Sequence, residues 1–265
     1  MRRCLLFFLL FTLFHPSADA QNAATLRVLC YNIHYGQGMD GQYDVARLAE
    51  VIKAAKPDLV ALQEVDVGVK RSGRVHQLQK LGELTGMTAR FGPTQHYEGG
   101  LFGNAVLTRL PILDELIQPL PYTEATPELQ TYPRGALVIT VKAPDGKPLR
   151  FISTHFQHNV PEDRIQEAKA INALFADPAD KLRTILAGDF NAKPQDEPIT
   201  LLEKHWTHAI DAARAPSVPS VNPKSRIDYI FYRGATDFRT LSSKVLPEQM
   251  ASDHRPILAE LAVLK

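Results

Sequence analysis

Ser252-Asp253-His254-Arg255-Pro256 is the most informative stretch of the sequence, because it is the last of several short polar phrases that stand beside apolar runs. The earlier phrases are Tyr31-Asn32-Ile33-His34, Gln63-Glu64, Thr154-His155, Gly188-Asp189-Phe190-Asn191 and Arg226-Ile227-Asp228-Tyr229. Carboxylate, amide and imidazole groups that leave water must be hydrogen-bonded, paired or metal-bound. The pattern therefore predicts strands that deliver these groups to one hydrolytic metal site.

The apolar runs between these phrases outline an α/β chain. Alternation and turn residues predict strands at 26–31, 58–62, 89–91, 104–108, 136–141, 149–154, 184–187, 227–232 and 256–263. Helical spacing and capping residues predict helices at 45–55, 77–84, 161–175 and 198–205. Proline-rich segments at 118–135 and 216–223 are expected to be loops. The irregular alternation of strands and helices favours two mixed sheets with outer helices.

The N-terminus has the pattern of a secretory signal peptide over residues 1–20. Arg2-Arg3 is followed by an apolar run from Cys4 to Phe14 and by the small-residue exit Ala18-Asp19-Ala20. An apolar run of this length is short of the roughly 20 residues that a membrane-spanning helix needs, and we expect no transmembrane segment elsewhere. We expect export to the periplasm or medium after cleavage near Ala20, and a monomeric catalytic domain over residues 21–265.

The charge balance of residues 21–265 bears on possible partners. Without residues 1–20 the chain carries 28 basic and 28 acidic residues. Proteins that hold long nucleic acid nonspecifically usually carry a basic excess, because their affinity comes from neutralising phosphates. Nucleic acid is therefore possible but not favoured. Only Cys30 remains after cleavage, so no intramolecular disulfide can form and stability must come from a core.

Phosphoester hydrolysis requires a hard cation and an activated water, and the polar phrases can supply both requirements. Mg²⁺ prefers oxygen ligands and takes one or two carboxylates from a protein, and Mn²⁺ is the alternative. Glu64 is the expected principal ligand, with Asn32 and Asp253 as neighbours that act directly or through water.

The remaining polar residues have expected roles around the water and the leaving group. Asp189 is expected to be the base and Asn191 an orienting donor, because residues two apart in extended chain point to the same side. His254 needs a partner that fixes its tautomer, and Asp228 is the candidate. His155 would protonate the leaving oxygen or stabilise the phosphorane. Arg71 and Arg134 are candidates for holding a substrate phosphate, because a guanidinium offers fixed bidentate donors, although both could be ordinary surface arginines.

From about Leu26 to Val263 the chain resembles the endonuclease/exonuclease/phosphatase (DNase I-like) superfamily. The resemblance rests on the phrases above together with Leu62-Gln63-Glu64-Val65-Asp66 and Gly103-Asn104-Ala105-Val106-Leu107-Thr108-Arg109. It implies a four-layer α/β sandwich of two mixed sheets covered by helices. By the same resemblance Glu64 is the metal residue, Asp189 with Asn191 handles water and phosphate, and Asp228 orients His254. Asn104 becomes a further candidate substrate contact, and an acidic partner for His155 cannot be assigned.

Within that superfamily the chain is similar to small exported bacterial hydrolases and to the domain linked with lipid remodelling of glycosylphosphatidylinositol anchors. Gly36-Gln37-Gly38-Met39-Asp40-Gly41 and Arg134-Gly135 are typical of that branch. We therefore expect a metal-dependent phosphoesterase, and more narrowly a phosphodiesterase acting on a small or lipid-linked phosphate ester by in-line water attack. A DNase I-like endonuclease is the alternative, and a non-catalytic module that binds a phosphorylated ligand is a third interpretation.

Overall fold

The computed structural model describes residues 24–211, 213–234 and 236–264, so the predicted signal peptide at residues 1–20 lies outside the described part of the chain. In chain order the elements are β1 (Ala24–Asn32), the 3-10 turn η2 (His34–Gly36), α1 (Val45–Ala55), β2 (Leu59–Val67), α2 (Gln77–Thr85), β3 (Thr88–Tyr97), β4 (Gly100–Thr108), β5 (Ile112–Leu120), β6 (Arg134–Lys142), β7 (Pro148–His155), α3 (Pro161–Phe175), β8 (Thr184–Asp189), α4 (Glu197–Glu203), β9 (Thr207–His208), β10 (Asp228–Arg233), β11 (Phe238–Val245) and β12 (Ile257–Val263).

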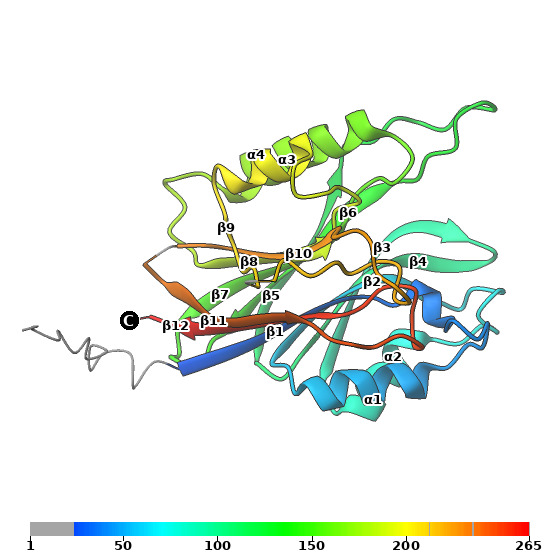
Figure 1. Cartoon of the computed structure of the whole chain (residues 1–265), viewed down its shortest axis with the longest axis horizontal. Helices are drawn as coiled ribbons and strands as arrows, with labels where there is room; N and C mark the ends of the chain where they lie inside the picture. Colours follow the sequence, from blue (N-terminus) through cyan, green and yellow to red (C-terminus); the bar gives the residue numbers. More distant parts are fainter. Residues whose placement is uncertain (1–23, 212, 235, 265) are drawn as a thin grey trace, which may run out of the picture.

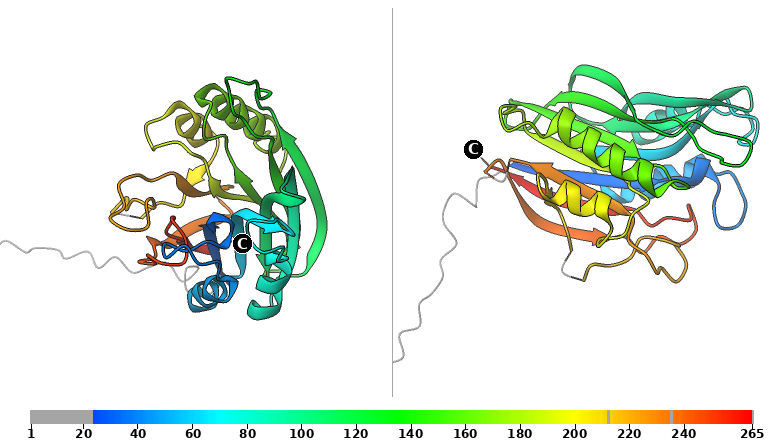
Figure 2. Two further views of the ribbon diagram at one scale, coloured as in Figure 1. Left: turned by 90° about the vertical axis from the view of Figure 1, so that its right-hand side faces the viewer. Right: turned by 90° about the horizontal axis from the view of Figure 1, so that it is seen from above.

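The strands form two six-stranded sheets. Their orders are β11-β12-β1-β2-β4-β3 and β5-β6-β7-β8-β10-β9. In the first sheet β1 and β2 are parallel and the other neighbours antiparallel, and in the second the parallel pair is β7 and β8. Helices α1 and α2 cover the outer face of the first sheet, and α3 and α4 cover that of the second (Figures 1 and 2). The four-layer sandwich of two mixed sheets is confirmed.

Three apolar clusters hold the layers together. The central one lies between the sheets and includes Val28, Ile139 and Phe151, none of which is exposed. A second cluster packs α1 and α2 onto the first sheet, and a third packs α3 and α4 onto the second. Burial of a large aliphatic or aromatic side chain contributes about 1.5–3 kcal/mol. Apolar packing thus anchors both outer layers and the centre.

Helix α1 shows how local sequence fixes these layers. The side chain of Asp44 accepts a hydrogen bond from the backbone N–H of Arg47, which caps the helix N-terminus as expected. Val45, Leu48 and Ile52 then form the buried stripe that packs on the sheet. The resulting β1-α1-β2 unit has its counterpart in β7-α3-β8, and each unit brings two parallel strands to the same end of the sandwich.

The edges of the sheets differ from the sequence expectation. Residues 118–135 are not one long loop, because β5 continues to Leu120 and β6 already begins at Arg134. Strands β5 and β11 were not predicted at all. Both are edge strands with mostly exposed or half-buried side chains, so they lack the apolar runs that reveal the central strands. None of the described helices is long and apolar enough to cross a bilayer.

Candidate active site

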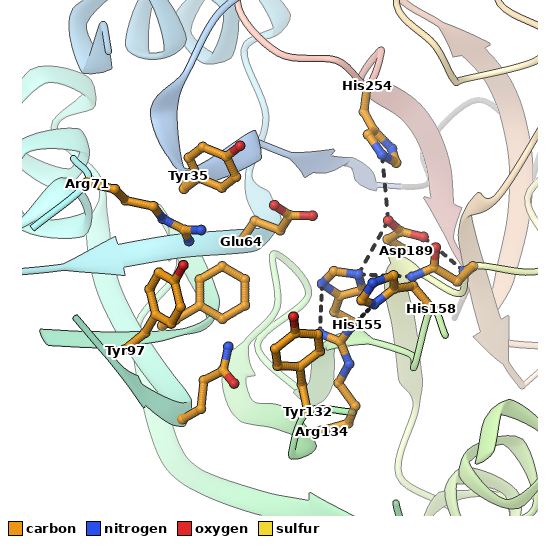
Figure 3. Close-up of a pocket in the computed structure, with 13 residues that line it drawn as sticks. Tyr35, Glu64, Arg71, Tyr97, Tyr132, Arg134, His155, His158, Asp189 and His254 are labelled. Atoms are coloured by element: carbon orange, nitrogen blue, oxygen red, sulfur yellow. Dashed lines mark hydrogen bonds and ion pairs between the residues drawn. The ribbon is translucent and has the colours of Figure 1, made fainter. Parts of the chain in front are cut away.

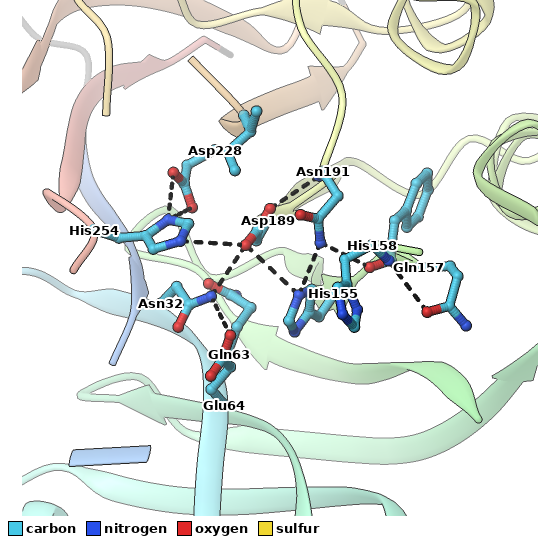
Figure 4. A network of polar contacts seen from close by, with 12 residues as sticks. Asn32, Gln63, Glu64, His155, Gln157, His158, Asp189, Asn191, Asp228 and His254 are labelled. Atoms are coloured by element: carbon cyan, nitrogen blue, oxygen red, sulfur yellow. Dashed lines mark hydrogen bonds and ion pairs between the residues drawn. The ribbon is translucent and has the colours of Figure 1, made fainter. Parts of the chain in front are cut away.

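The polar residues gather where the carboxyl ends of the two parallel strand pairs meet (Figure 4). Asn32 ends β1, His155 ends β7 and Asp189 ends β8, while Glu64 lies in β2. His155 stands beside Asp189 in the parallel pair of β7 and β8. Asp228, the first residue of β10, stands opposite Asp189 in the antiparallel pair of β8 and β10. The topology therefore brings together residues from both sheets that are far apart in the sequence.

Glu64 reaches the site through a bulge in β2. The sequence predicts that this strand ends at Leu62, but β2 continues to Val67. Gln63 and Glu64 together stand opposite the single residue Asn104 of β4, and Glu64 has a left-handed φ of 58°. A bulge re-aims one side chain without ending the strand, which is common beside active sites. Glu64 thus faces the pocket while Gln63 turns inward to Ser153 and Cys30.

Asn32 joins two carboxylates. Its amide nitrogen lies 3.0 Å from Glu64 Oε1 and 3.0 Å from Asp189 Oδ2, and its oxygen accepts the backbone N–H of His34 at 3.0 Å. The accepted hydrogen bond from His34 fixes which end of the amide faces the carboxylates. Asn32 was expected as an oxygen ligand of the metal, whereas here it presents N–H donors that hold Glu64 and Asp189 close together.

Asn191 reaches His155 by a turn rather than by extended chain. The expectation of an extended segment is wrong, because Asn191 has a left-handed φ of 48°. Its backbone N–H donates to Asp189 Oδ1 at 2.9 Å, and its side-chain nitrogen lies 3.0 Å from both His155 Nε2 and the Phe156 carbonyl oxygen. Asparagine tolerates this conformation better than most residues do. The turn places the backbone N–H of Asn191 on Asp189 and its side-chain amide beside His155.

Gly188 permits the close approach of β7 and β8 at this point. A Cβ atom at residue 188 would overlap the carbonyl oxygen of Thr154. The glycine is therefore needed for packing rather than for an unusual backbone angle. It sets Asp189 directly next to His155.

His254 and Asp228 form the predicted buried pair. His254 Nδ1 lies 2.9 Å from Asp228 Oδ2, which also accepts a 2.6 Å hydrogen bond from Ser217 Oγ. Burial lowers the pKa of His254, but the carboxylates of Asp228 and Asp189 outweigh it and hold that pKa well above its usual value. Burial and Asp228 raise the pKa of Asp189 to about 7. The His254 imidazolium thus supplies positive charge between two carboxylates.

Two groups of side chains could hold a divalent cation. One consists of Asp189, Asp228 and His254, and the other of Glu64 with Asp189. Ligand atoms of Asp189, Asp228 and His254 all lie within 4.8 Å of one another. However, His254 Nδ1 is already bonded to Asp228, and the raised pKa of His254 favours a proton over a metal there. Glu64 instead offers Oε2, which makes no hydrogen bond within the described residues, beside a second carboxylate. A hard cation with oxygen ligands fits the Glu64 side.

Asp253 lies apart from this centre. Its side chain is 37% exposed and its Oδ1 is 3.9 Å from His34 Nδ1, and the residue does not line the pocket. The backbone carbonyl of Asp253 accepts the N–H of Ser220. The structure thus brings Glu64 and Asp189 together and leaves the expected neighbour Asp253 outside the lining of the pocket.

Arg134, rather than an acidic residue, lies beside His155 Nδ1. Its Nη1 lies 3.4 Å from His155 Nδ1 and its Nη2 lies 3.3 Å from His158 Nδ1. Burial and this guanidinium hold the pKa of His155 well below its usual value. A neutral His155 suits stabilisation of a phosphoryl oxygen better than donation of a proton to the leaving group.

Arg134 itself is a buried cation without a carboxylate partner. Its residue is 6% exposed, it forms no ion pair within the described part of the chain, and its Nε has no hydrogen-bond partner there. Burial lowers its pKa, and a buried unpaired charge is expensive. Because the guanidinium lines the pocket, a bound anion would satisfy it.

These groups surround a cavity of about 320 Å³ (Figure 3). Seven of the predicted site residues line it, namely Glu64, Arg71, Arg134, His155, Asp189, Asn191 and His254. Six further lining residues were missed by sequence reasoning, namely Tyr35, Gln95, Tyr97, Phe102, Tyr132 and His158. Four of them, Tyr35, Phe102, Tyr132 and His158, stand within three residues of a polar phrase, which is a usable signal, whereas Gln95 and Tyr97 have no such neighbour.

Asn104 lies next to the pocket without lining it. Its side chain is 2% exposed, does not line the cavity, and donates to the carbonyl oxygen of Gly135 at 2.9 Å. The bond links β4 with β6, and so ties the bulge at Glu64 to the strand that starts with Arg134. The expected substrate contact is therefore a link between the two sheets.

Glu167 is a buried carboxyl behind Arg134. It is fully buried in α3, both its oxygens accept the backbone N–H of Gln157, at 2.9 and 3.3 Å, and Gln157 in turn donates to the Tyr132 carbonyl. Burial raises the pKa of Glu167 to about 8, although the Gln157 bond and Arg134 act in the opposite direction. Through Gln157, this carboxyl therefore supports the two segments that carry the pocket residues Tyr132 and His158.

Glu167→Gln should make stability less dependent on pH. Between about 4.5 and 8 the folded carboxyl keeps a proton that the unfolded chain has lost, so the free energy of unfolding falls as pH rises. We expect the decline to be smaller in Glu167→Gln by on the order of 3 kcal/mol between pH 5 and 9. Urea unfolding across this range measures it, and the exposed Glu162→Gln in the same helix is the control. Parallel curves for wild type and Glu167→Gln would contradict the assignment.

Comparisons with known proteins agree with this geometry. Residues 29–254 match the model of the Endonuclease/Exonuclease/phosphatase family. A search of curated proteins finds no match. Among solved structures, an endonuclease/exonuclease/phosphatase from Beutenbergia cavernae is 26% identical with a TM-score of 0.69, and the match covers 90% of this chain and 72% of that one.

Two further structures share the fold at lower identity. Mannosyl-6-phosphatase from Bacteroides thetaiotaomicron is 21% identical with a TM-score of 0.72, covering 89% of this chain and 99% of that one. The human Nocturnin catalytic domain with bound sulfate anion is 18% identical with a TM-score of 0.69, covering 90% and 94%. The family match covers most of the chain and agrees with the two-sheet fold and with the polar phrases that meet at one end of it. The protein therefore belongs to the endonuclease/exonuclease/phosphatase family.

Proposed function

We propose that the protein is a divalent-metal-dependent phosphoesterase that hydrolyses its substrate by in-line attack of water, without a covalent enzyme intermediate. The observation that carries the proposal is the convergence of Glu64, Asp189, Asn191 and His254 on one cavity, together with the unpaired cation of Arg134. The cation, the attacking water and the charge on the phosphoryl group then each have a side chain that can serve them.

Glu64 would hold Mg²⁺ or Mn²⁺, with Asp189 nearby. When bound, the cation would neutralise negative charge on the phosphoryl oxygens. Asn32 keeps the two carboxylates close to one another by donating to both. Asp253, which does not line the cavity, would act through water.

Asp189 would take the proton of the attacking water. Its pKa of about 7 suits a base at neutral pH, because the group is partly ionised and still basic. Asn191 orients that water, since its backbone N–H fixes Asp189 and its side chain lies beside His155. Neutral His155 would contact a phosphoryl oxygen.

His254 and Arg134 would bind the negative charge that develops on the phosphoryl group. His254 Nε2 lies 3.8 Å from Asp189 Oδ2, and Asp228 fixes the ring through Nδ1. Arg134 faces the same cavity from β6. Each preorganised donor of this kind typically lowers the activation barrier by about 3–4 kcal/mol, which corresponds to a rate increase of about 10²–10³-fold.

We infer a phosphodiester substrate on a small or lipid-linked group rather than duplex DNA. The equal numbers of acidic and basic residues after position 20 support this choice. The names of structural relatives include a mannosyl-6-phosphatase, which supports small phosphate esters as a class. We also propose that residues 1–20 direct export to the periplasm or medium, and that the catalytic domain acts as a monomer.

A comparison of substrates tests this proposal. The mature protein with Mg²⁺ should release nitrophenol from bis-nitrophenyl phosphate, and should cleave phospholipid or sphingolipid headgroups faster than plasmid DNA. Rapid plasmid nicking at moderate salt would favour the endonuclease instead. Absence of hydrolysis with every ester would contradict an enzymatic function and favour a binding module.

A further inference from the structure

The end of the cavity beyond Glu64 contains an arginine enclosed by aromatic rings. The Arg71 guanidinium carbon lies 3.8 Å from the ring centroid of Tyr35, 4.6 Å from that of Tyr97 and 5.3 Å from that of Phe102. These three residues, here called the aromatic box, all line the cavity (Figure 3). All three distances are within the range of about 6 Å over which a cation is attracted to a ring face.

Asp66 fixes the guanidinium inside the aromatic box. Arg71 Nε and Nη2 each lie 2.9 Å from one oxygen of Asp66, whose side chain is fully buried. The backbone N–H of Arg71 also donates to Glu98 Oε2 at 2.8 Å. Such a bidentate pair has a fixed geometry. Arg71 is therefore a permanent occupant of the box rather than a mobile surface side chain.

The guanidinium still offers one donor group to the cavity. Within the described residues Nη1 of Arg71 makes no hydrogen bond, and the side chain is 23% exposed. Gln95, which pairs with Phe102 across β3 and β4, lines the cavity with an amide, and Tyr132, whose ring stacks on His158, lines it with a phenol. Figure 3 shows the hydroxyl of Tyr132 directed toward the space below Glu64. This end of the cavity thus combines neutral hydrogen-bonding groups with one guanidinium edge.

The charges at this end do not suit a cationic ligand. The carboxylates that line the cavity are Glu64 and Asp189, and both belong to the catalytic end. Asp66 is turned away into its pair with Arg71. A quaternary ammonium group is recognised by open aromatic faces or by free carboxylates. Here Arg71 already covers the aromatic faces.

We propose that this end of the cavity is a leaving-group subsite for a neutral ring polyol, a pyranose or a cyclitol, and that Arg71 excludes quaternary ammonium headgroups by occupying the aromatic box. The inference rests on the proposed phosphoesterase function and names the class of its substrate. Ring hydroxyls can accept from Arg71 Nη1 and exchange hydrogen bonds with Gln95 and Tyr132. The same ring chemistry occurs in free sugar phosphates and in glycolipid headgroups.

A matched pair of inhibitors tests the subsite. Inositol 1-phosphate and phosphocholine are both monoesters, and they differ in the alcohol alone. In hydrolysis of bis-nitrophenyl phosphate by the mature protein with Mg²⁺, inositol 1-phosphate should have an inhibition constant about ten-fold or more below that of phosphocholine. Glycerophosphoinositol and phosphatidylinositol vesicles, assayed as substrates, then distinguish a free from a lipid-linked source.

Variants of the box show whether Arg71 causes the preference. Arg71→Gln alone would leave Asp66 buried without its counter-ion, so Asp66→Asn/Arg71→Gln is the better test because it removes both charges. In the double variant the preference for inositol 1-phosphate should shrink to about two-fold or reverse, since the aromatic faces are open to a cation. Arg74→Gln is the control, because Arg74 is an exposed arginine of the same loop that bonds to the Gly68 carbonyl and does not line the cavity.

The outcomes separate the subsite from the function on which it rests. Equal inhibition by the two phosphates, or an unchanged preference in the double variant, would overturn the subsite and leave the phosphoesterase intact. Absence of metal-dependent nitrophenol release would contradict the phosphoesterase. In that case calorimetric titration of the two phosphates into the protein with Mg²⁺ still decides the subsite, and equal affinities would reject it.

Discussion

Asp189→Asn is expected to lower kcat for phosphate-ester hydrolysis by about a thousand-fold or more, because the amide keeps the shape of the side chain but cannot accept the proton of water. Asp189 is 2% exposed, and its oxygens contact the side chain of Asn32 and the backbone N–H of Asn191. An asparagine has only one side-chain oxygen, so it can keep only one of these two contacts as a hydrogen-bond acceptor. The measurement is kcat with bis-nitrophenyl phosphate at saturating Mg²⁺.

Loss of folding must be separated from loss of chemistry in this variant. Asp189 and Asp228 are neighbouring buried carboxylates, and the charge of Asp228 raises the pKa of Asp189. Removing one of two like buried charges should leave Tm near that of wild type or raise it. Asp114→Asn in β5 is the matched control, because that aspartate is exposed and remote from the cavity. Turnover of Asp189→Asn within ten-fold of wild type would remove Asp189 from the role of base.

Asp228→Asn is the second change with a large expected effect. Asp228 accepts from His254 Nδ1 and from Ser217 Oγ, so it fixes the ring tautomer and stabilises the imidazolium. We expect kcat to fall about 10³–10⁴-fold, because an amide at this position favours the wrong tautomer. His254→Ala should have a loss of similar size. Ser217→Ala, which removes one hydrogen bond to the carboxylate, should have a much smaller effect.

The Asp228 and His254 variants should not be additive. If Asp228 acts through His254, the double variant Asp228→Asn/His254→Ala should be no slower than His254→Ala alone. A double variant whose loss equals the product of the two single losses would show that the residues act independently. Circular dichroism and Tm of each protein exclude misfolding as the common cause.

The central strands and the site residues that they carry could be predicted from the sequence because each strand combines an apolar run with a polar end. Asn32, His155 and Asp189 all terminate buried strands, and parallel pairing forces such ends to meet. The pair of Asp228 and His254 followed from the same reasoning. No comparable signal marks β5 or β11, whose edge positions leave most of their side chains at least partly exposed.

Other features depend on tertiary contacts that no short pattern records. The sequence does not indicate that Glu64 lies on a bulge, since the bulge is a property of the pairing between β2 and β4. Nor does it indicate that Arg134 approaches His155 Nδ1. Tyr97 and Tyr132 come from β3 and from the segment before β6, and only the packing of the two sheets brings them to one cavity.

The proposed function requires that Glu64 hold a divalent cation on which hydrolysis depends. The most direct measurement is titration of Mg²⁺ and Mn²⁺ into EDTA-treated, dialysed protein with bis-nitrophenyl phosphate as substrate, for wild type, Glu64→Gln and the exposed control Glu50→Gln in α1. We expect no turnover without metal, saturable recovery in wild type and control, and at least about a ten-fold higher metal requirement in Glu64→Gln. Turnover that survives removal of metal, or a Glu64→Gln variant with the metal requirement of wild type, would contradict the proposed function.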